Sequence, residues 1–240
     1  MSVIATATFD DQSFEVEVFR DGSLEFLDQD LQYDAAAVEF GYAQTPALKF
    51  KQEWDCNAPK AIIDYIPLSF EHLVLLGVDW AEHTIGVFPV DCLIEEGVLR
   101  KQAPFAESME LARKYARGGF EDNELRKTIF RLESYIATLI REQHQEPARI
   151  AARALWSILN ATQAPDAFAA SENIRMVSEF SIKAASLKYK EVYREHGPNW
   201  VVTFDGFGHD YEMVWQVQRF VDCMEAIGQG KDWPDLGATP

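Results

Sequence analysis

Apolar and polar positions alternate with a period of two residues in the first part of the chain. In residues 13–18, SFEVEV, apolar side chains alternate with glutamates, the pattern of a strand with one buried face. Asp21-Gly22 follows and favours a tight hairpin turn, because glycine adopts a positive φ without steric cost. Residues 24–26, LEF, can then bury the same face from a second strand. With a further strand at residues 3–9, the pattern predicts an antiparallel meander whose opposite face carries the glutamates.

Further strands are predicted in this part of the chain from short apolar runs. Such a run can be either a strand or a buried turn of helix. For residues 73–78, LVLLGV, the glycine and the polar step that follows favour a strand. The other predicted strands lie at residues 36–43, 60–66 and 84–94.

From Pro104 onward the apolar period becomes that of a helix. Gly118-Gly119 is typical of a helix C-terminus, and Pro147 suits the first turn of a later helix. Helices are predicted at residues 104–119, 121–145, 147–162, 166–196 with an interruption near 178–181, and 210–227, with a strand-like piece at 199–208.

Strands followed by helices, rather than strands alternating with helices, predict an α+β fold. We expect an N-terminal antiparallel strand-rich unit followed by a C-terminal helical bundle. The predicted domains are an acidic strand-rich domain at residues 1–100 and a helical domain at residues 104–228, with their boundary near residues 97–104. The polar, turn-rich residues 229–240 are expected to form a mobile tail.

The negative charge is concentrated in the first hundred residues. The chain has 240 residues and a net charge of −17, of which residues 1–100 contribute −14, from 19 acidic and 5 basic residues. Residues 101–240 carry 20 acidic and 17 basic residues, a net charge of −3. A strongly acidic surface repels nucleic acid phosphates and anionic membranes. We therefore expect no direct binding of nucleic acid and no membrane contact.

A cytoplasmic location is expected. No stretch reaches the about 18–20 uncharged apolar residues that a spanning helix needs. The N-terminal residues lack the basic start and continuous apolar core of a signal peptide. Cys56, Cys92 and Cys223 have no close spacing, so we expect reduced thiols rather than disulfides or a metal cluster.

The familiar motifs for catalysis, metals and cofactors are absent from the sequence. There is no GxxxxGK[ST] or GxGxxG phosphate loop, no HExxH metal motif and no GxSxG nucleophile motif. Gly206-Phe207-Gly208 is interpreted as a tight turn, since Asp205 and Asp210 beside it would repel a pyrophosphate. No cofactor, metal ligand or catalytic residue is therefore predicted.

Two histidines support an enzyme as an alternative hypothesis. His209 begins the sequence HDYE at a predicted helix start, where its neighbouring acids Asp210 and Glu212 also stabilise the helix dipole. His83 follows Glu82. A small hydrolase-like enzyme would use carboxylates with His209 or His83 in a site between the two halves.

The tryptophans support a third hypothesis, a structural assembly subunit. Trp156 lies at helical spacing from apolar neighbours and is expected in the core. Four others stand beside acidic or amide residues near strand ends or loops, where they would be either partly buried or interface anchors. These are Trp54, Trp80, Trp200 and Trp233.

The predicted helices contain segments that resemble one known family. Residues 105–119, FAESMELARKYARGG, form a helix with a small-residue stop that leads through acidic residues into further helices, one of which carries the run AARA at residues 151–154. Over residues 105–185 the chain resembles the immunity proteins of bacterial polymorphic-toxin systems. The resemblance implies a protein that works by binding another protein, and it implies no catalytic residue.

The acidic residues of the first part are the candidate partner-binding site. Soluble surfaces usually mix both signs of charge, whereas here basic residues are scarce. General solubility is one account of this charge, and attraction of a basic partner is the other. The leading hypothesis is a cytoplasmic binder that neutralises a basic partner, such as a toxin or a nucleic-acid-processing enzyme, in the manner of an immunity protein or a phage inhibitor that mimics nucleic acid. The helical half would scaffold the contact or form a homodimer. The candidate residues are Glu15, Glu17, Glu25, Asp28, Asp30, Asp34 and Glu39.

Overall fold

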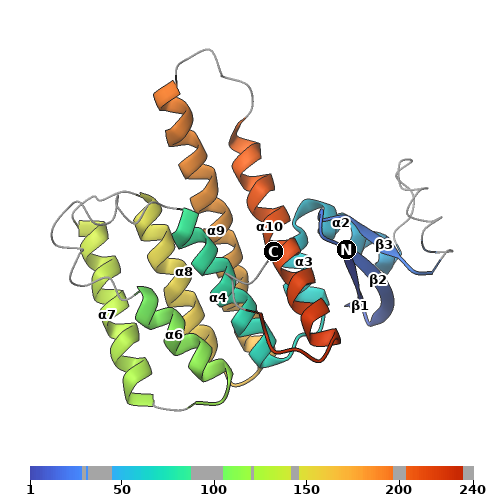
Figure 1. Ribbon diagram of the computed structural model, residues 1–240, viewed down its shortest axis with the longest axis horizontal. Helices are drawn as coiled ribbons and strands as arrows, with labels where there is room; N and C mark the ends of the chain where they lie inside the picture. Colours follow the sequence, from blue (N-terminus) through green and yellow to red (C-terminus); the bar gives the residue numbers. More distant parts are fainter. Residues whose placement is uncertain are drawn as a thin grey trace. The chain divides into compact units, whose positions relative to one another are not determined.

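The chain has an α+β architecture, with an antiparallel sheet followed by helices (Figure 1). The computed structural model describes residues 1–28, 31, 45–87, 105–119, 122–141, 146–196 and 204–234. The chain divides into two compact units. We name Met1–Leu68 with Met213–Pro240 the sheet unit, and Ser69–Glu212 the helical unit.

The sheet confirms the predicted meander. Its strands are β1 (Ser2–Phe9), β2 (Gln12–Phe19) and β3 (Leu24–Phe26), in the order β1-β2-β3, and both pairs are antiparallel. Asp10 and Asp11 join β1 to β2 with φ values of 47° and 62°. Two positive φ values in a two-residue loop define the type I′ hairpin turn, whose twist matches that of the strands.

One face of the sheet is covered by α2 (Pro46–Cys56). The ring of Phe50, fully buried, lies 5.8 Å from that of Phe14 and 6.3 Å from that of Phe26. Burying a side chain of this size contributes about 1.5–3 kcal/mol. Val16 and Val18 of β2 are fully buried on the same face, so the alternation of the sequence becomes an apolar inner face.

Two predicted strands are wrong, because both segments are helical. Residues 60–66 overlap α3 (Ala58–Tyr65), which begins after Asn57, whose side chain accepts a hydrogen bond from the Lys60 amide at 3.0 Å. Residues 73–78 lie within α4 (Phe70–Val87). This helix packs against α6, α8 and α9. Because it is buried on several sides, its apolar residues form a continuous run rather than a single stripe.

Gly77 lies inside α4 rather than at the end of a strand. A Cβ atom at this position would lie 2.6 Å from Cδ1 of Ile174, so the glycine allows α4 to approach α9 closely and does not end a strand. Of the strand predicted at residues 84–94, residues 84–87 form the last turn of α4, and the rest lies outside the described residues. The strand predicted at residues 36–43 also lies outside them.

The helical unit confirms the predicted helices of the later part. Besides α4 it contains α6 (Phe105–Ala116), α7 (Asp122–Arg141), α8 (Glu146–Thr162) and α9 (Ala167–His196), which lie side by side (Figure 1). Gly118 ends α6 with a φ of 84°, as predicted for a C-terminal glycine. The interruption predicted near residues 178–181 is absent, because α9 continues through them.

The last helix, α10 (Phe204–Gly228), begins earlier than predicted. It includes Gly206-Phe207-Gly208, so the tight turn assigned to these residues is wrong, and so is the strand-like reading from Phe204 onward. Arg219 of α10 donates a hydrogen bond to the carbonyl oxygen of Pro234, which follows the helix. The predicted boundary at residues 97–104 lies outside the described residues, and α4 belongs with the later helices.

Three hydroxyl groups are buried in α6 and α7 without a hydrogen-bond partner among the described residues. They belong to Ser108, Thr128 and Tyr135, whose exposed fractions are 1, 1 and 5%. The Tyr135 ring contacts that of Phe105 edge to face at 5.5 Å. Burial raises the pKa of Tyr135 to about 12.

We predict that Tyr135→Phe leaves the free energy of unfolding at pH 7 unchanged or raises it by about 1 kcal/mol, because a buried hydroxyl without a partner is removed. The wild type should lose stability as the pH rises from about 10 to about 12, since tyrosine ionises near pH 10 in the unfolded chain and only near pH 12 when folded. Tyr135→Phe should not show the loss of stability that the ionisation of Tyr135 causes in this pH range. Urea unfolding at pH 7, 9 and 11 measures both effects.

Tyr135→Leu is the control, since it removes the hydroxyl together with the ring contact to Phe105, and it should lower the stability. A loss of more than about 1 kcal/mol in Tyr135→Phe at pH 7 would contradict the prediction, because a hydroxyl with a partner behaves in that way.

Candidate functional site

The outer face of the sheet carries three predicted site residues. Since Phe14, Val16 and Val18 point to the core, Glu15 and Glu17 of β2 point to the opposite face. The register pairs Glu17 with Ile4 of β1 on one side and with Glu25 of β3 on the other. Glu15 pairs with Thr6. The structure therefore brings Glu15, Glu17 and Glu25 together, as the alternation predicts, and we name the surface formed by these three glutamates with Ile4 and Thr6 the acidic face.

The acidic face carries repelling charges. Glu17 and Glu25 lie directly opposite each other on adjacent strands, an arrangement that destabilises a sheet when both are ionised. Ser2 donates a hydrogen bond to Glu17 at 2.5 Å, but no ion pair joins the three glutamates to a Lys or Arg of the described part of the chain. Their charge is therefore directed at solvent.

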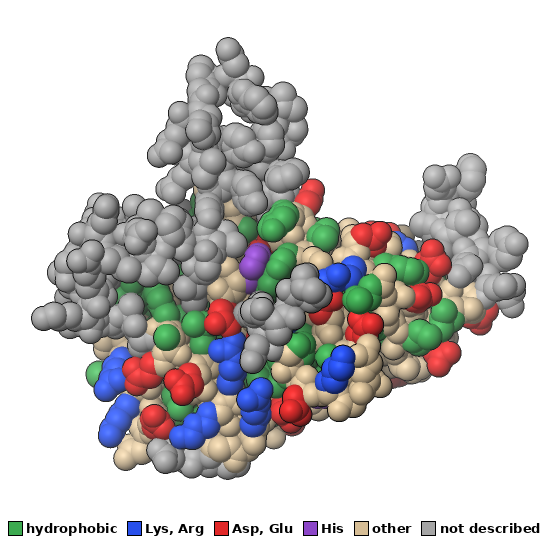
Figure 2. Space-filling model, in the orientation of Figure 1, with side chains coloured by type: hydrophobic (Ala, Val, Ile, Leu, Met, Phe, Trp, Pro, Cys, Tyr) green, Lys and Arg blue, Asp and Glu red, His purple; other side chains and the backbone are tan. Residues whose placement is uncertain are grey.

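The basic residues of Met1–Leu68, the N-terminal part of the sheet unit, are paired with other acids. Arg20 binds Asp222 at 2.8 Å, and Lys49 binds Asp10 at 3.1 Å. Lys51 pairs with Asp55, and Lys60 lies between Glu53 at 3.3 Å and Asp64 at 3.2 Å. In the helical unit both signs of charge occur together over α6 and α7 (Figure 2). An example is Arg131 with Glu107 at 2.9 Å.

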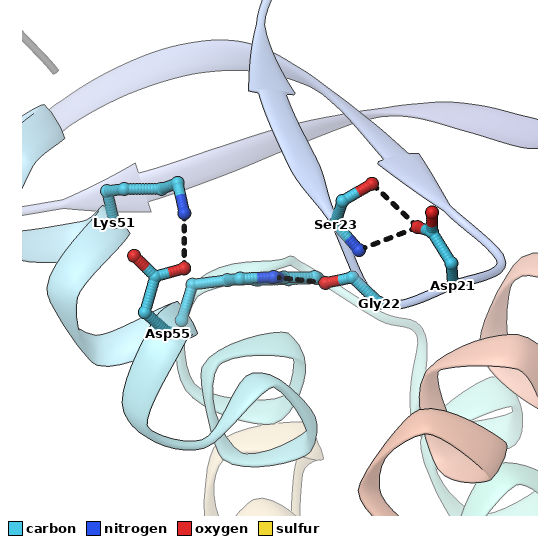
Figure 3. Close-up of polar contacts among 6 residues, drawn as sticks. Asp21, Gly22, Ser23, Lys51 and Asp55 are labelled. Carbon is cyan, nitrogen blue, oxygen red and sulfur yellow. Dashed lines mark hydrogen bonds and ion pairs between the residues drawn. The ribbon is translucent and has the colours of Figure 1, made fainter. Parts of the chain in front are cut away.

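The turn between β2 and β3 is fixed by polar contacts (Figure 3). Ser23 donates two hydrogen bonds to the Asp21 carboxylate, from its hydroxyl at 2.6 Å and from its amide at 2.9 Å. These bonds hold the pKa of Asp21 below its ordinary value. Gly22 has a φ of 88°, and its carbonyl accepts a hydrogen bond from Nε1 of Trp54 at 2.9 Å. The predicted hairpin is confirmed, and a helix side chain positions it.

The structure describes some of the other predicted residues, among them three of the tryptophans and one of the remaining acids. Trp54 and Trp80 are 2% and 0% exposed, so neither is an interface anchor, and both are buried more deeply than the partial burial that was the other expectation. Trp156 is half-buried and donates to Glu133 at 3.2 Å. Asp28 is exposed just beyond the end of β3. Asp30, Asp34 and Glu39 lie outside the described residues, as does Trp200.

A second polar cluster lies within the helical unit. Nδ1 of His83 on α4 is 3.1 Å from Oε2 of Glu212 on α10, whose side chain is 1% exposed. One turn earlier on α4, the buried Asp79 lies 3.6 Å from Arg113 of α6, which also pairs with Glu82. An imidazole held by a buried carboxylate can act as an oriented base. Among the described residues no group of three or more His, Cys, Asp or Glu is placed to hold a metal ion.

Sequence reasoning named some members of this cluster but not their contact. His83 and Glu212 were considered in separate motifs 129 residues apart, and no local pattern joins them. Arg113 was missed, although its position in the last turn of α6 is where basic residues are favourable. The side chain of His209 is outside the described part of the structure.

Comparisons with protein-family models, curated proteins and solved structures each gave no match. The resemblance of residues 105–185 to immunity proteins therefore stays a prediction. In the part of the chain that the structure describes, no helix is long and apolar enough to span a membrane.

We predict that Glu25→Lys raises the free energy of unfolding by about 0.5–1 kcal/mol, because it replaces a repelling pair with an attracting one opposite Glu17. The gain should shrink in 0.5 M NaCl, since exposed charges are screened. Urea unfolding at low and high salt measures it. Glu25→Gln removes only the repulsion and should give a smaller gain. Equal stability of all three proteins at low salt would show that Glu17 and Glu25 do not interact.

Proposed function

We propose that the chain binds a basic partner protein through the acidic face. The observation that supports this proposal is the arrangement of charge in the sheet unit. Three glutamates share one outward face without an ion pair to a described Lys or Arg, while the bases of Met1–Leu68 in the same unit pair with other acids. A surface that serves solubility alone usually mixes acidic and basic residues, whereas the acidic face has acids without bases.

The repulsion within the acidic face would be relieved on binding. Like charges opposite each other on a sheet cost about 0.2–1 kcal/mol in the free protein. A Lys or Arg of the partner placed between Glu17 and Glu25 would interact with both carboxylates and remove this cost. The repulsion between Glu17 and Glu25 in the free chain therefore favours the binding of a cation between them.

The charge also indicates the class of partner. A face that repels phosphates attracts the proteins that bind phosphates, since their surfaces are basic. We therefore propose a cytoplasmic inhibitor of a basic toxin or nucleic-acid-processing enzyme, of the immunity or nucleic-acid-mimic type. The helical unit would scaffold the contact. Dimerisation through that unit stays a prediction, and its exposed apolar side chains include Phe130 and Phe168.

The test uses Glu15→Gln, Glu17→Gln and Glu25→Gln combined in one variant. Its association with the partner recovered by affinity purification at low salt should slow about tenfold or more, with a smaller change in dissociation, because surface charges act chiefly on encounter. Stopped-flow or surface binding at several salt concentrations measures both rates. The wild-type rate should fall steeply with salt, and the variant's rate should fall less steeply.

A matched control removes the same charge from the helical unit. Glu110, Glu172 and Glu179 are exposed there, and their combined replacement by Gln should leave the association rate within about twofold of the wild type. If the control variant slows association as much as the acidic-face variant does, overall charge rather than the acidic face attracts the partner.

The pairing of His83 with the buried Glu212 favours one alternative, a small hydrolase-like enzyme. In that case His83 acts as a general base, and His83→Gln lowers the rate of hydrolysis about 100-fold or more without unfolding the chain. A panel of p-nitrophenyl esters and phosphates measures the activity, and circular dichroism measures folding. The binding proposal expects no hydrolysis above the uncatalysed rate. It also expects unchanged partner binding in His83→Gln.

A further inference from the structure

The outer edge of β1 offers backbone groups for another strand. Among the described residues β1 pairs with β2 alone. The Arg20 amide donates to the Met1 carbonyl at 3.2 Å, which makes Met1 and Arg20 a hydrogen-bonded pair. In an antiparallel ladder such pairs alternate, so Val3, Ala5 and Ala7 face β2 with their backbone groups. The amides and carbonyls of the intervening residues point to the free edge, and these residues are Ser2, Ile4, Thr6 and Thr8.

In the part of the chain that the structure describes, this edge lacks the features of sequence and register that normally prevent strand addition. Residues 2–9, SVIATATF, contain no charged residue and no proline. The register runs through all eight residues without a bulge, so the edge is regular. Ile4 is 67% exposed, and Val3 and Ala5 are partly exposed although their neighbours in β2 are fully buried.

We infer that the free edge of β1 binds an extended segment of the basic partner, which pairs antiparallel to β1 and carries Lys or Arg at alternate positions with apolar residues between them. The inference rests on the proposed function. It adds that the basic residues of the partner lie on an extended segment that pairs with β1. Strand addition of this kind obtains affinity from main-chain hydrogen bonds and specificity from the alternate side chains.

The two faces of the sheet differ in character, and this difference predicts the alternation of basic and apolar residues in the added strand. On the outer face, every second side chain of an added strand would lie beside Ile4 and Thr6 and about 10 Å from Glu15 and Glu17, two strand spacings away. A Lys or Arg side chain can reach across that distance toward the carboxylates. On the inner face, the intervening side chains would lie beside Val3 and Ala5 at the rim of the apolar core.

Charge favours a basic segment over a second copy of this chain. Two copies each carry a net charge of −17 and repel each other. Moreover, β1 has no basic residue, so a second β1 would bring no cation to Glu15 or Glu17. A segment with alternating bases satisfies the backbone groups and the carboxylates together.

The probe is a blocked hexapeptide of alternating Lys and Val, titrated into the whole chain at 20 mM and 300 mM NaCl. It should bind at low salt and protect the amides of Ile4, Thr6 and Thr8 from hydrogen exchange at least tenfold, and higher salt should weaken it at least tenfold. In antiparallel pairing the Lys amides of the peptide face β1. Methylation of the Lys amides should therefore weaken binding at least tenfold, whereas methylation of the Val amides should not.

The outcomes separate this inference from the proposed function. Equal binding of both methylated peptides, or no protection of the three amides, overturns the edge inference, while binding that still depends on Glu15, Glu17 and Glu25 leaves the proposed function standing. No binding of the basic peptide up to 1 mM also overturns the edge inference. A dimer of this chain that protects the same amides, seen by sedimentation at low salt, assigns the edge to a second copy and overturns the choice of occupant.

Discussion

The sheet depends on the aromatic side chain of Phe50, whose ring lies between 5.8 and 6.3 Å from the rings of Phe14, Phe26, Trp54 and Tyr65. Three strands, one of them three residues long, are close to the lower limit for a stable sheet, and such a sheet needs a helix or another apolar layer. With this packing on the inner face, the outer face contributes little to holding the fold together. Its side chains can therefore be chosen for charge alone, even where two glutamates oppose each other.

The sequence predicts the parts of the fold that follow from local periodicity. Alternation by two residues identifies the buried and the outward side chains of β2, because side chains in a strand alternate between faces. The helices after residue 104 have a clear apolar stripe and were predicted for the same reason. The apolar run of α4 has no such stripe, because several helices bury it, and the close approach of Ile174 to Gly77 joins residues far apart in the sequence.

The candidate sites also differ in how much of them the sequence predicts. The grouping of Glu15, Glu17 and Glu25 follows from strand alternation and one hairpin, so sequence is sufficient for it. That these acids have no described basic partner depends on the positions of bases far along the chain. The contact of His83 with Glu212 likewise requires α4 and α10 to be placed in three dimensions, because 129 residues separate them.

The ion pair between Arg20 and Asp222 joins residues 202 positions apart and belongs to a unit made from two separate stretches of the chain. The helical unit is thus an insertion within the sheet unit. During synthesis the inserted helices emerge whole and can fold first, whereas the meander must wait for residue 222 before it gains this contact. Closing so long a loop is slow, so the acidic face reaches its final support late in folding. A ribosome-bound or truncated chain that lacks α10 would present the helices without a completed sheet unit.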